Sequence, residues 1–451
     1  MKNLSAVAAL LLFVLSAPLR AAAIEYDAGH IPKPEILLPD GTAKALVVLL
    51  SDAKGWTPTE EAEAQRLKDN GSIVIGIDTP AYLAELRKDD GECVYMISDI
   101  EDLVHQAERT AEVNTYLPPI VAGIGDGGAL ALAMLAQTPR ATIGQTLAVD
   151  PQAGIPLLHQ LCTPAVRSAN GDRMIYGLAD GELPDPLTVV FSSAAPSGGR
   201  QHVDRLVAIH DDIDVQDMDA DAASILSTTL DDLIASQSTD DPLGLPLDIL
   251  DVAVPTHDTM AVVYSGDGGW RDLDREVAGY LQQQGMPVVG VDSLRYFWSE
   301  KTPQQTADDL AKIVRTYGKR WKVRHILLVG YSFGADVLPA TYNRLPDQLK
   351  QKVAQLSLLA LSHQVDYEIS VTGWLGVPGA GASGDPLTDI KLIDPGLVQC
   401  FYGKDEQDDA CRDLKGSKVD VNELEGGHHF DGDYESLARL IIERLVRKLA
   451  P

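Results

Sequence analysis

The stretch His325 to Pro339 reads HILLVGYSFGADVLP and decides the fold of the chain around it. Its first five residues form a short apolar run, which is the pattern of a buried strand. Gly330 to Gly334 then match G-x-S-x-G, and the apolar spacing that follows indicates a helix. A strand, a tight turn and a helix in this order predict a nucleophile elbow with Ser332 at its tip. A turn that only links strand to helix is the simpler alternative.

The two glycines of this motif have a mechanical reason. A nucleophile at the tip of an elbow sits in a strained backbone conformation, and side chains on either side of it would collide with the neighbouring strand and helix. The hydroxyl of Ser332 would then stand above the carboxyl end of the sheet. The N-terminus of the following helix would point at any negative charge that develops there.

The beginning of the chain is typical of an export signal. Lys2 gives a weakly positive start, residues 4–18 are almost wholly apolar, and residues 21–23 are three alanines. The apolar run is shorter than the ~20 residues that span a bilayer. We therefore expect residues 1–23 to be a cleaved signal peptide and the mature protein to be periplasmic.

Composition narrows the possible partners. The chain has 451 residues, of which 45% are hydrophobic and 23% charged, as in a packed globular protein. Its length favours two domains. The net charge of −29 argues against nucleic acid as a partner and against simple electrostatic adhesion to anionic lipid.

Four cysteines are present, two in each half of the chain. In an oxidising compartment they can pair within halves, as Cys93 with Cys162 and Cys400 with Cys411, although the sequence alone leaves other pairings open. No spacing of His and Cys residues resembles a zinc site. We expect no metal and no cofactor.

The two halves of the chain repeat one another. Residues 45–56 read ALVVLLSDAKGW and residues 261–270 read AVVYSGDGGW. The offset is 214 residues both for the tryptophans (270 − 56) and for Asp292 and Asp78 (292 − 78). A constant offset over separate blocks predicts an internal duplication. Each copy alternates apolar strand runs with helical stretches, which is typical of an α/β domain with a mainly parallel sheet.

The duplication sets the expected domains, and the copies differ where chemistry would occur. Residues 24–235 form the first domain, 236–255 a linker and 256–451 the second domain. The first copy has Gly125 where the second has Ser332, and its end lacks a His-rich turn. We therefore expect the first domain to be a degenerate copy without catalytic residues.

A serine nucleophile needs a base, because its hydroxyl is weakly nucleophilic near neutral pH. In α/β-hydrolases the triad follows the order Ser, acid, His along the chain. Residues 425–434 read EGGHHFDGDY, with a helical stretch after them. His428 directly follows the two glycines and is the expected base, with His429 as the alternative base. A second alternative is that the two histidines are a surface pair without a catalytic role.

The acid should follow the strand that precedes this turn, Leu397 to Tyr402. Glu406 stands three residues past Gly403 and is the first candidate, with Asp405 as the alternative. The carboxylate would hold the imidazole in the correct tautomer and stabilise the imidazolium. Asp408 and Asp409 nearby are expected to be solvated loop charges.

An oxyanion hole is also required, and Ser265 to Trp270, SGDGGW, follows the first strand of the second copy. Backbone N–H groups at Gly266, Asp267 and Gly268 are candidate donors, together with the N–H of Phe333 after the nucleophile. A flexible turn closed by a packing tryptophan is the alternative. The Gly/Ala-rich stretch 373–384 is either a lid over an acyl group or a plain surface loop.

Taken together, the motifs SGDGGW, GYSFGADVLP, WLG, FYGKDE and GGHHF resemble those of the bacterial virulence protein VirJ family over nearly all of residues 256–451. The two-copy length resembles the longer, AcvB-like members. The resemblance implies a periplasmic serine hydrolase of lipase type. For AcvB-like members the implied substrate is lysyl-phosphatidylglycerol, an aminoacylated phospholipid at the membrane surface, and the family is tied to virulence, membrane lipids and type IV secretion.

The sequence thus predicts two tandem α/β-hydrolase-like domains with one active site. Ser332 would attack the aminoacyl carbonyl, His428 would transfer the proton, and Glu406 or Asp405 would orient His428. The alternatives are a binding or assembly factor that contacts secretion-system proteins and keeps only the hydrolase shape, and an esterase for another acyl ester.

Overall fold

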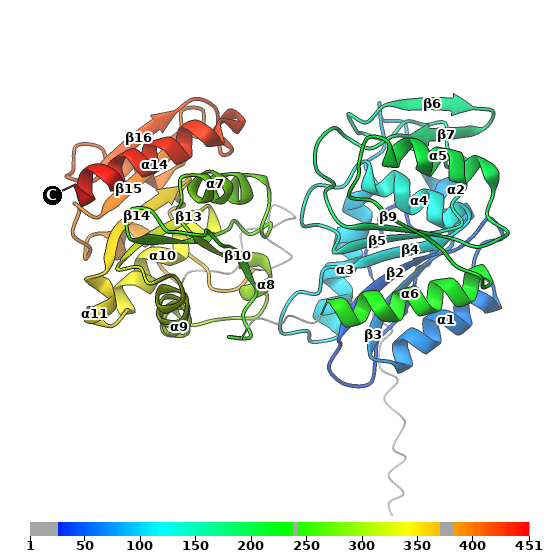
Figure 1. Cartoon of the computed structure of the whole chain (residues 1–451), viewed down its shortest axis with the longest axis horizontal. Helices are drawn as coiled ribbons and strands as arrows, with labels where there is room; N and C mark the ends of the chain where they lie inside the picture. The colour runs from blue at the N-terminus through cyan, green and yellow to red at the C-terminus, as the bar shows by residue number, and fades with distance from the viewer. Residues whose placement is uncertain (1–25, 238–241, 370–382, 451) are drawn as a thin grey trace, which may run out of the picture.

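The computed structural model describes residues 26–237, 242–369 and 383–450. It contains two seven-stranded sheets, each flanked by helices, which form the two lobes of Figure 1. The expected export signal, residues 1–23, and most of the stretch 373–384 lie outside the described residues. No helix in the described part of the chain is long and apolar enough to cross a membrane.

The first sheet has the strand order β1-β3-β2-β4-β5-β8-β9, with only β1 antiparallel to its neighbour. Its strands are β1 (Glu35–Leu37), β2 (Ala45–Leu50), β3 (Ser72–Ile77), β4 (Ile120–Ile124), β5 (Gln145–Val149), β8 (Leu187–Phe191) and β9 (Asp214–Asp217), and a separate hairpin comprises β6 (Arg167–Asn170) and β7 (Arg173–Tyr176). The helices are α1 (Pro58–Asp69), α2 (Thr79–Leu86), α3 (Ile97–Thr110), α4 (Asp126–Leu135), α5 (Ser197–Val207) and α6 (Ala222–Ser236).

The second sheet repeats this plan with the order β10-β12-β11-β13-β14-β15-β16, and again only the first edge strand is antiparallel. Its strands are β10 (Leu247–Leu250), β11 (Thr259–Tyr264), β12 (Val288–Val291), β13 (His325–Tyr331), β14 (Val353–Leu359), β15 (Val398–Gly403) and β16 (Asp420–Leu424). The helices are α7 (Asp272–Gln283), α8 (Ser293–Tyr296), α9 (Pro303–Trp321), α10 (Phe333–Arg344), α11 (Asp347–Lys350), α13 (Pro386–Ile390) and α14 (Tyr434–Leu449), with the 3₁₀ turns η1 (Ala410–Leu414) and η2 (Phe430–Gly432).

Both faces of each sheet are covered, which is why the central strands are continuous apolar runs rather than alternating ones. In the second domain, α7 and α14 pack on one face and α9 and α10 on the other. In the first domain, α1 and α6 take the place of α7 and α14. The fold is therefore two tandem α/β-hydrolase-like domains, as the sequence predicts.

Equivalent contacts hold the two copies in the same shape. The ring of Trp56 lies against Gly76 and the ring of Trp270 against Gly290, where any side chain on the glycine would overlap the indole. The hydroxyls of the two strand-end serines, 51 and 265, each accept an N–H bond of 2.9 Å from the helix start beside them. These retained residues are structural in both domains.

The predicted linker is too long at its C-terminal end. Residues 247–250 form β10, the antiparallel edge strand of the second sheet, which pairs with β12 from Leu247↔Val291 to Leu250↔Val288. The second domain therefore begins before residue 256. A four-residue edge strand bonded on one side carries too short a pattern to be recognised from the sequence.

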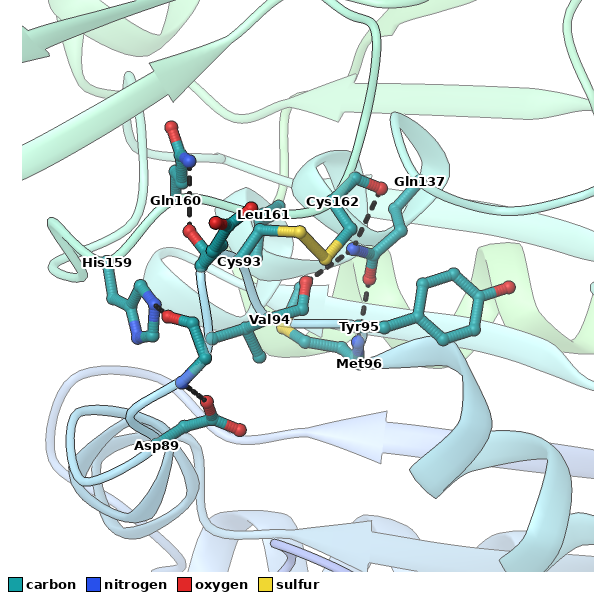
Figure 2. The surroundings of a disulfide bond; sticks show 12 residues. Asp89, Cys93, Val94, Tyr95, Met96, Gln137, His159, Gln160, Leu161 and Cys162 are labelled. Atoms are coloured by element: carbon teal, nitrogen blue, oxygen red, sulfur yellow. Dashed lines mark hydrogen bonds between the residues drawn. A yellow bond between two sulfur atoms is a disulfide. The ribbon is translucent and has the colours of Figure 1, made fainter.

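Both disulfides within halves are present. Cys400 on β15 is bonded to Cys411 on η1, and Cys93 is bonded to Cys162. Figure 2 shows the second of these together with Gln137, whose side-chain amide donates to the carbonyl oxygen of Val94 at 2.6 Å and accepts from the N–H of Met96 at 2.7 Å. This cross-link fixes the segment that leads into α3.

Candidate active site

The nucleophile elbow lies between β13 and α10. Ser332 has φ 49° and ψ −119°, the strained region expected at the tip of an elbow. A Cβ atom at Gly330 would overlap the carbonyl oxygen of Gly334, and one at Gly334 would overlap the carbonyl oxygen of Tyr264 on β11. The two glycines are thus required by close backbone approach, and they leave the Ser332 side chain at the carboxyl end of the sheet.

The structure brings His428 to the serine. His428 follows β16 across the turn at Gly426, and its Nε2 lies 3.0 Å from Ser332 Oγ, a hydrogen-bond distance. The neighbouring His429 has a different partner, because its Nδ1 lies 2.8 Å from the hydroxyl of Tyr331. Of the two candidate bases, only His428 contacts the nucleophile.

Glu406 stands on the opposite side of the imidazole. It follows β15, and its Oε2 lies 3.6 Å from His428 Nδ1, an ion-pair distance slightly longer than a hydrogen bond. Catalytic hydrogen bonds are often long in an unliganded site and shorten when substrate binds. The alternative acid, Asp405, is exposed, and the carboxylate that pairs with His428 is that of Glu406. Ser332, His428 and Glu406 therefore lie in the order along the chain and in space that a triad requires.

The expectation for the loop after the acid is wrong at one residue. Asp409 is 3% exposed, and its side chain accepts from the N–H of Cys411 at the start of η1. Burial raises the pKa of Asp409 to about 7, and the N–H of Cys411 lowers it in part. Asp408 is 97% exposed, as predicted. Asp409 is bonded to the disulfide residue Cys411 and is buried with it. No local sequence pattern indicates this contact.

The surroundings of His428 favour its neutral form. Burial lowers the pKa of His428 below its ordinary value, the charge of Glu406 raises it, His429 lowers it, and Asp267 raises it. A neutral imidazole near neutral pH is able to accept the proton of Ser332. Because both carboxylates favour the imidazolium, they also stabilise the ion that forms after proton transfer.

The predicted oxyanion turn lies directly beside the nucleophile. A Cβ atom at Gly266 would be 3.7 Å from Ser332 Cβ, so the start of this turn is against the elbow. Gly269 closes the turn with φ 85° and donates its N–H to the carbonyl oxygen of Gly266 at 3.2 Å. Phe333 is the first residue of α10, and its N–H belongs to the helix end that has no partner within the helix.

Buried Asp274 adds a feature that the sequence does not reveal. It is 2% exposed, and burial raises its pKa well above the ordinary value, with the N–H groups of Arg271 and Gly266 acting against that rise. Since the N–H of Gly266 is directed at Asp274, we expect the second oxyanion donor to come from Asp267 or Gly268. Acidic residues are common in the first turn of a helix, where Asp274 lies, so the sequence does not indicate that this one is buried beside the oxyanion turn.

The site opens into a pocket of about 390 Å³. The acidic side chains on its wall belong to Asp267, Asp272 and Asp274. One wall residue, Pro139, comes from the first domain. No group of three or more His, Cys, Asp or Glu side chains within the described ranges is arranged to hold a metal ion.

The equivalent position in the first domain has no triad. Gly125 stands at the tip of the elbow between β4 and α4, and residues 218–221, MDAD, connect β9 directly to α6 without a histidine. The N–H of Asp126, equivalent to that of Phe333, donates to Asp52 Oδ1 at 2.9 Å. A carboxylate of the chain itself thus occupies the place where an active elbow would hold the oxyanion.

Comparison with curated protein sequences finds no match. Among solved structures, Est1E from Butyrivibrio proteoclasticus, solved with ferulic acid, matches with 11% identity and a TM-score of 0.31, over 47% of this chain and 98% of that one. The α/β hydrolase GrgF from Penicillium sp. sh18 matches with 14% identity and a TM-score of 0.34, over 46% of this chain and 100% of that one. A putative thioesterase from silicibacter sp. tm1040 matches with 18% identity and a TM-score of 0.30, over 48% and 81%.

These structural similarities are too low to assign an activity. The comparison with protein families gives a more specific result, because the matched residues include all three members of the candidate triad. Residues 258–449, which contain Ser332, Glu406 and His428, match the family described as bacterial virulence protein (VirJ).

Proposed function

We propose that the second domain is a serine hydrolase that cleaves esters by acyl transfer. The observation that carries this proposal is the 3.0 Å contact between His428 Nε2 and Ser332 Oγ at the tip of a strained elbow. An elbow whose serine had no histidine beside it would be only a structural turn. Because His428 contacts Ser332, a base is positioned to take the serine proton.

The chemistry follows from the geometry. Ser332 Oγ attacks the ester carbonyl carbon while His428 accepts its proton, and the charge that develops on the carbonyl oxygen is stabilised by the N–H of Phe333 and the turn at Gly266–Gly269. The intermediate collapses, and His428 returns the proton to the departing alcohol. Water then attacks the acyl-enzyme by the same route and releases the acid. Glu406 holds His428 in orientation throughout.

The proposed substrate is the aminoacyl ester of lysyl-phosphatidylglycerol. Two observations support it: the match of residues 258–449 to the VirJ family, and the acidic wall of the pocket. Oδ1 of Asp274 is buried and has no hydrogen-bond partner among the described residues, and a cationic aminoacyl group would compensate such a carboxylate. Attack on the aminoacyl carbonyl would release phosphatidylglycerol, and hydrolysis of the acyl-enzyme would then release lysine.

The proposal includes a periplasmic location and a role in membrane lipid balance or virulence. The N-terminal sequence supports export. The two disulfides support an oxidising compartment, where such bonds persist.

The test is lysine release from vesicles that contain lysyl-phosphatidylglycerol, with the mature chain beside Ser332→Ala. We expect release by the wild type and none above background by the variant. If the wild type cleaves p-nitrophenyl acetate but releases no lysine, the enzyme class stands and the aminoacyl-lipid substrate is wrong. If a folded wild type cleaves neither substrate and a fluorophosphonate does not label Ser332, the hydrolase proposal is wrong.

A second candidate function is a periplasmic binding or assembly factor, including one that contacts a secretion system. The first domain favours it, because that domain keeps the fold while Gly125 replaces the nucleophile. The absence of both ester cleavage and serine labelling in the folded protein would support this candidate.

A further inference from the structure

One face of α3 in the first domain is turned toward the second domain (Figure 1). Glu101, His105, Glu108 and Arg109 follow the spacing i, i+4, i+7 and i+8, which places them on one stripe of the helix. His105 and Glu108 are buried. A stripe of charged residues on a helix is ordinarily a solvated face, so the burial of these two side chains indicates specific packing around it. Glu108 accepts from the N–H of Leu117 in its own domain, whereas the ring of His105 lies beside that of Trp298 in the second domain.

Arg109 and a cluster of rings attach this stripe to the second domain. The guanidinium of Arg109 lies 3.8 Å above the ring of Trp298 and donates to the backbone carbonyl oxygens of Trp298 and Ile369. The rings of Tyr116 and His105 lie 5.1 Å and 5.4 Å from that of Trp298, which is 1% exposed. Tilted ring contacts and charged hydrogen bonds to carbonyl groups define one relative position of the helix.

Glu101 on the same stripe reaches the candidate active site. Its Oε1 accepts from Arg271 Nη2 at 2.9 Å, and the two side chains are only 17% and 29% exposed. Arg271 lies two residues after the oxyanion turn, just before α7. Its side chain packs against the turn, since a Cβ atom at Gly268 would lie 3.2 Å from Arg271 Nε. Arg271 also lines the pocket of Ser332. Glu101 thus holds the side chain that covers the turn.

The start of α3 is itself fixed. Cys93 is bonded to Cys162, and Gln137 bonds Val94 and Met96 just before the helix begins at Ile97 (Figure 2). The carboxylate of Glu101 therefore projects from a helix that is anchored at its start by a cross-link and near its end by Arg109. A rigid support of this kind is what a catalytic turn requires.

We propose that Glu101, in the domain without a triad, is a positioning residue of the Ser332 site that acts through Arg271 on the turn at Gly266–Gly269. The first domain is then a fixed part of the active site, whose wall it also completes with Pro139. The proposal rests on the proposed hydrolase function of that pocket. Its physical reason is that oxyanion donors act only when they are held at the developing charge, and a misplacement of about 1 Å can cost on the order of 10²-fold in rate.

The experiment compares Glu101→Gln with Glu368→Gln in the full chain. Glu368 lies 3.5 Å from Arg109 at the same interface, whereas Glu101 bonds Arg271, so Glu368 is the matched control. With p-nitrophenyl acetate we expect Glu101→Gln to lower kcat roughly tenfold or more with KM changed less than about twofold. Labelling of Ser332 by a fluorophosphonate should slow in parallel, and Glu101→Asp should recover part of the rate. Glu368→Gln should leave all of these unchanged.

The outcomes separate the positioning role from the proposed function. Wild-type activity with an unchanged kcat in Glu101→Gln would overturn the positioning role and leave the hydrolase intact. Equal losses in both variants, together with equal falls in melting temperature, would also overturn it, because they would indicate general loosening of the interface. Absence of hydrolysis and labelling in the folded wild type would overturn the proposed function, and the positioning role with it.

Discussion

The two elbows of this chain have nearly the same backbone and different residues at the tip. Gly125 has φ 59° and ψ −113°, and Ser332 has φ 49° and ψ −119°. In the first domain the carboxylate of Asp52 accepts a hydrogen bond from the N–H of Asp126. In the second domain the residue equivalent to Asp52 is Gly266, which has no side chain to do so. The elbow is therefore a property of the duplicated fold. The proposed activity depends on a nucleophile, on an elbow N–H that no carboxylate of the chain accepts from, and on an acid and a base on the loops after β15 and β16.

The first elbow has a relaxed local structure that suits the glycine at its tip. Glycine adopts a positive φ without the strain that a serine bears there. The internal carboxylate satisfies a helix N-terminus that would otherwise lack an acceptor. The first elbow is thus relaxed and closed by Asp52, whereas the second is strained and open. Under our proposal, the first domain contributes to the Ser332 site through α3.

The largest expected effect comes from Ser332→Gly, which converts the second elbow into the first. Ester hydrolysis should fall by roughly 10⁴-fold or more, because no nucleophile remains. The free energy of unfolding should be unchanged or higher by about 1 kcal/mol, since the positive φ no longer carries strain. Kinetics with p-nitrophenyl acetate and urea unfolding measure both. A variant that keeps substantial activity would contradict the assignment of the nucleophile.

Gly266→Asp would place in the second domain the carboxylate that Asp52 provides in the first. We expect kcat to fall by about 10²–10³-fold, because the new side chain would occupy the oxyanion position. Gly266 does not have a positive φ, and a Cβ atom there would approach Tyr331 only to 3.3 Å, so the fold should be kept. Gly266→Ala is the control and should retain most activity. Full activity in Gly266→Asp would show that the two elbows are not equivalent at the anion position.

Glu406→Gln tests the loop after β15. We expect kcat/KM to fall by about 10²-fold, because the imidazolium loses its partner. The charge of Glu406 raises the pKa of His428, so its removal lowers that pKa further and moves the acid limb of the pH–rate profile to lower pH. Asp405→Asn is the matched control. A loss in Asp405→Asn that exceeds the loss in Glu406→Gln would reverse the assignment of the acid.

The smallest effect is expected in the first domain. A Cβ atom at Gly125 would overlap Asp52 Oδ1, so Gly125→Ser should lower the free energy of unfolding by about 1–3 kcal/mol and leave ester hydrolysis unchanged. The double variant with Asp52→Gly should recover part of the stability. Urea unfolding and a p-nitrophenyl acetate assay check both points, and a gain of activity would mean that the first domain is not catalytically degenerate.

The sequence predicts the features that depend on residues close together in the chain or on a repeated pattern. The elbow at Ser332 is a strand, a G-x-S-x-G turn and a helix within fifteen residues, and a constant offset reveals the duplication. The structure brings the first-choice acid and base, Glu406 and His428, to the nucleophile.

What the sequence could not predict depends on contacts between distant residues. Glu101 and Arg271 are 170 residues apart and belong to different domains, and each reads as an ordinary surface charge. β10 is four residues long and takes its register from β12. Asp409 is buried by the disulfide turn beside it. In each case tertiary packing decides the environment of a residue whose local pattern is neutral.

The central claim is that the second elbow is catalytically active and the first is not. Its most direct test is fluorophosphonate labelling of the intact chain, with the adduct mapped by mass spectrometry. A single adduct at Ser332, absent from Ser332→Ala and slowed in Glu101→Gln, is the result we predict. An adduct on the first domain, or no adduct on a protein shown to be folded, would contradict it.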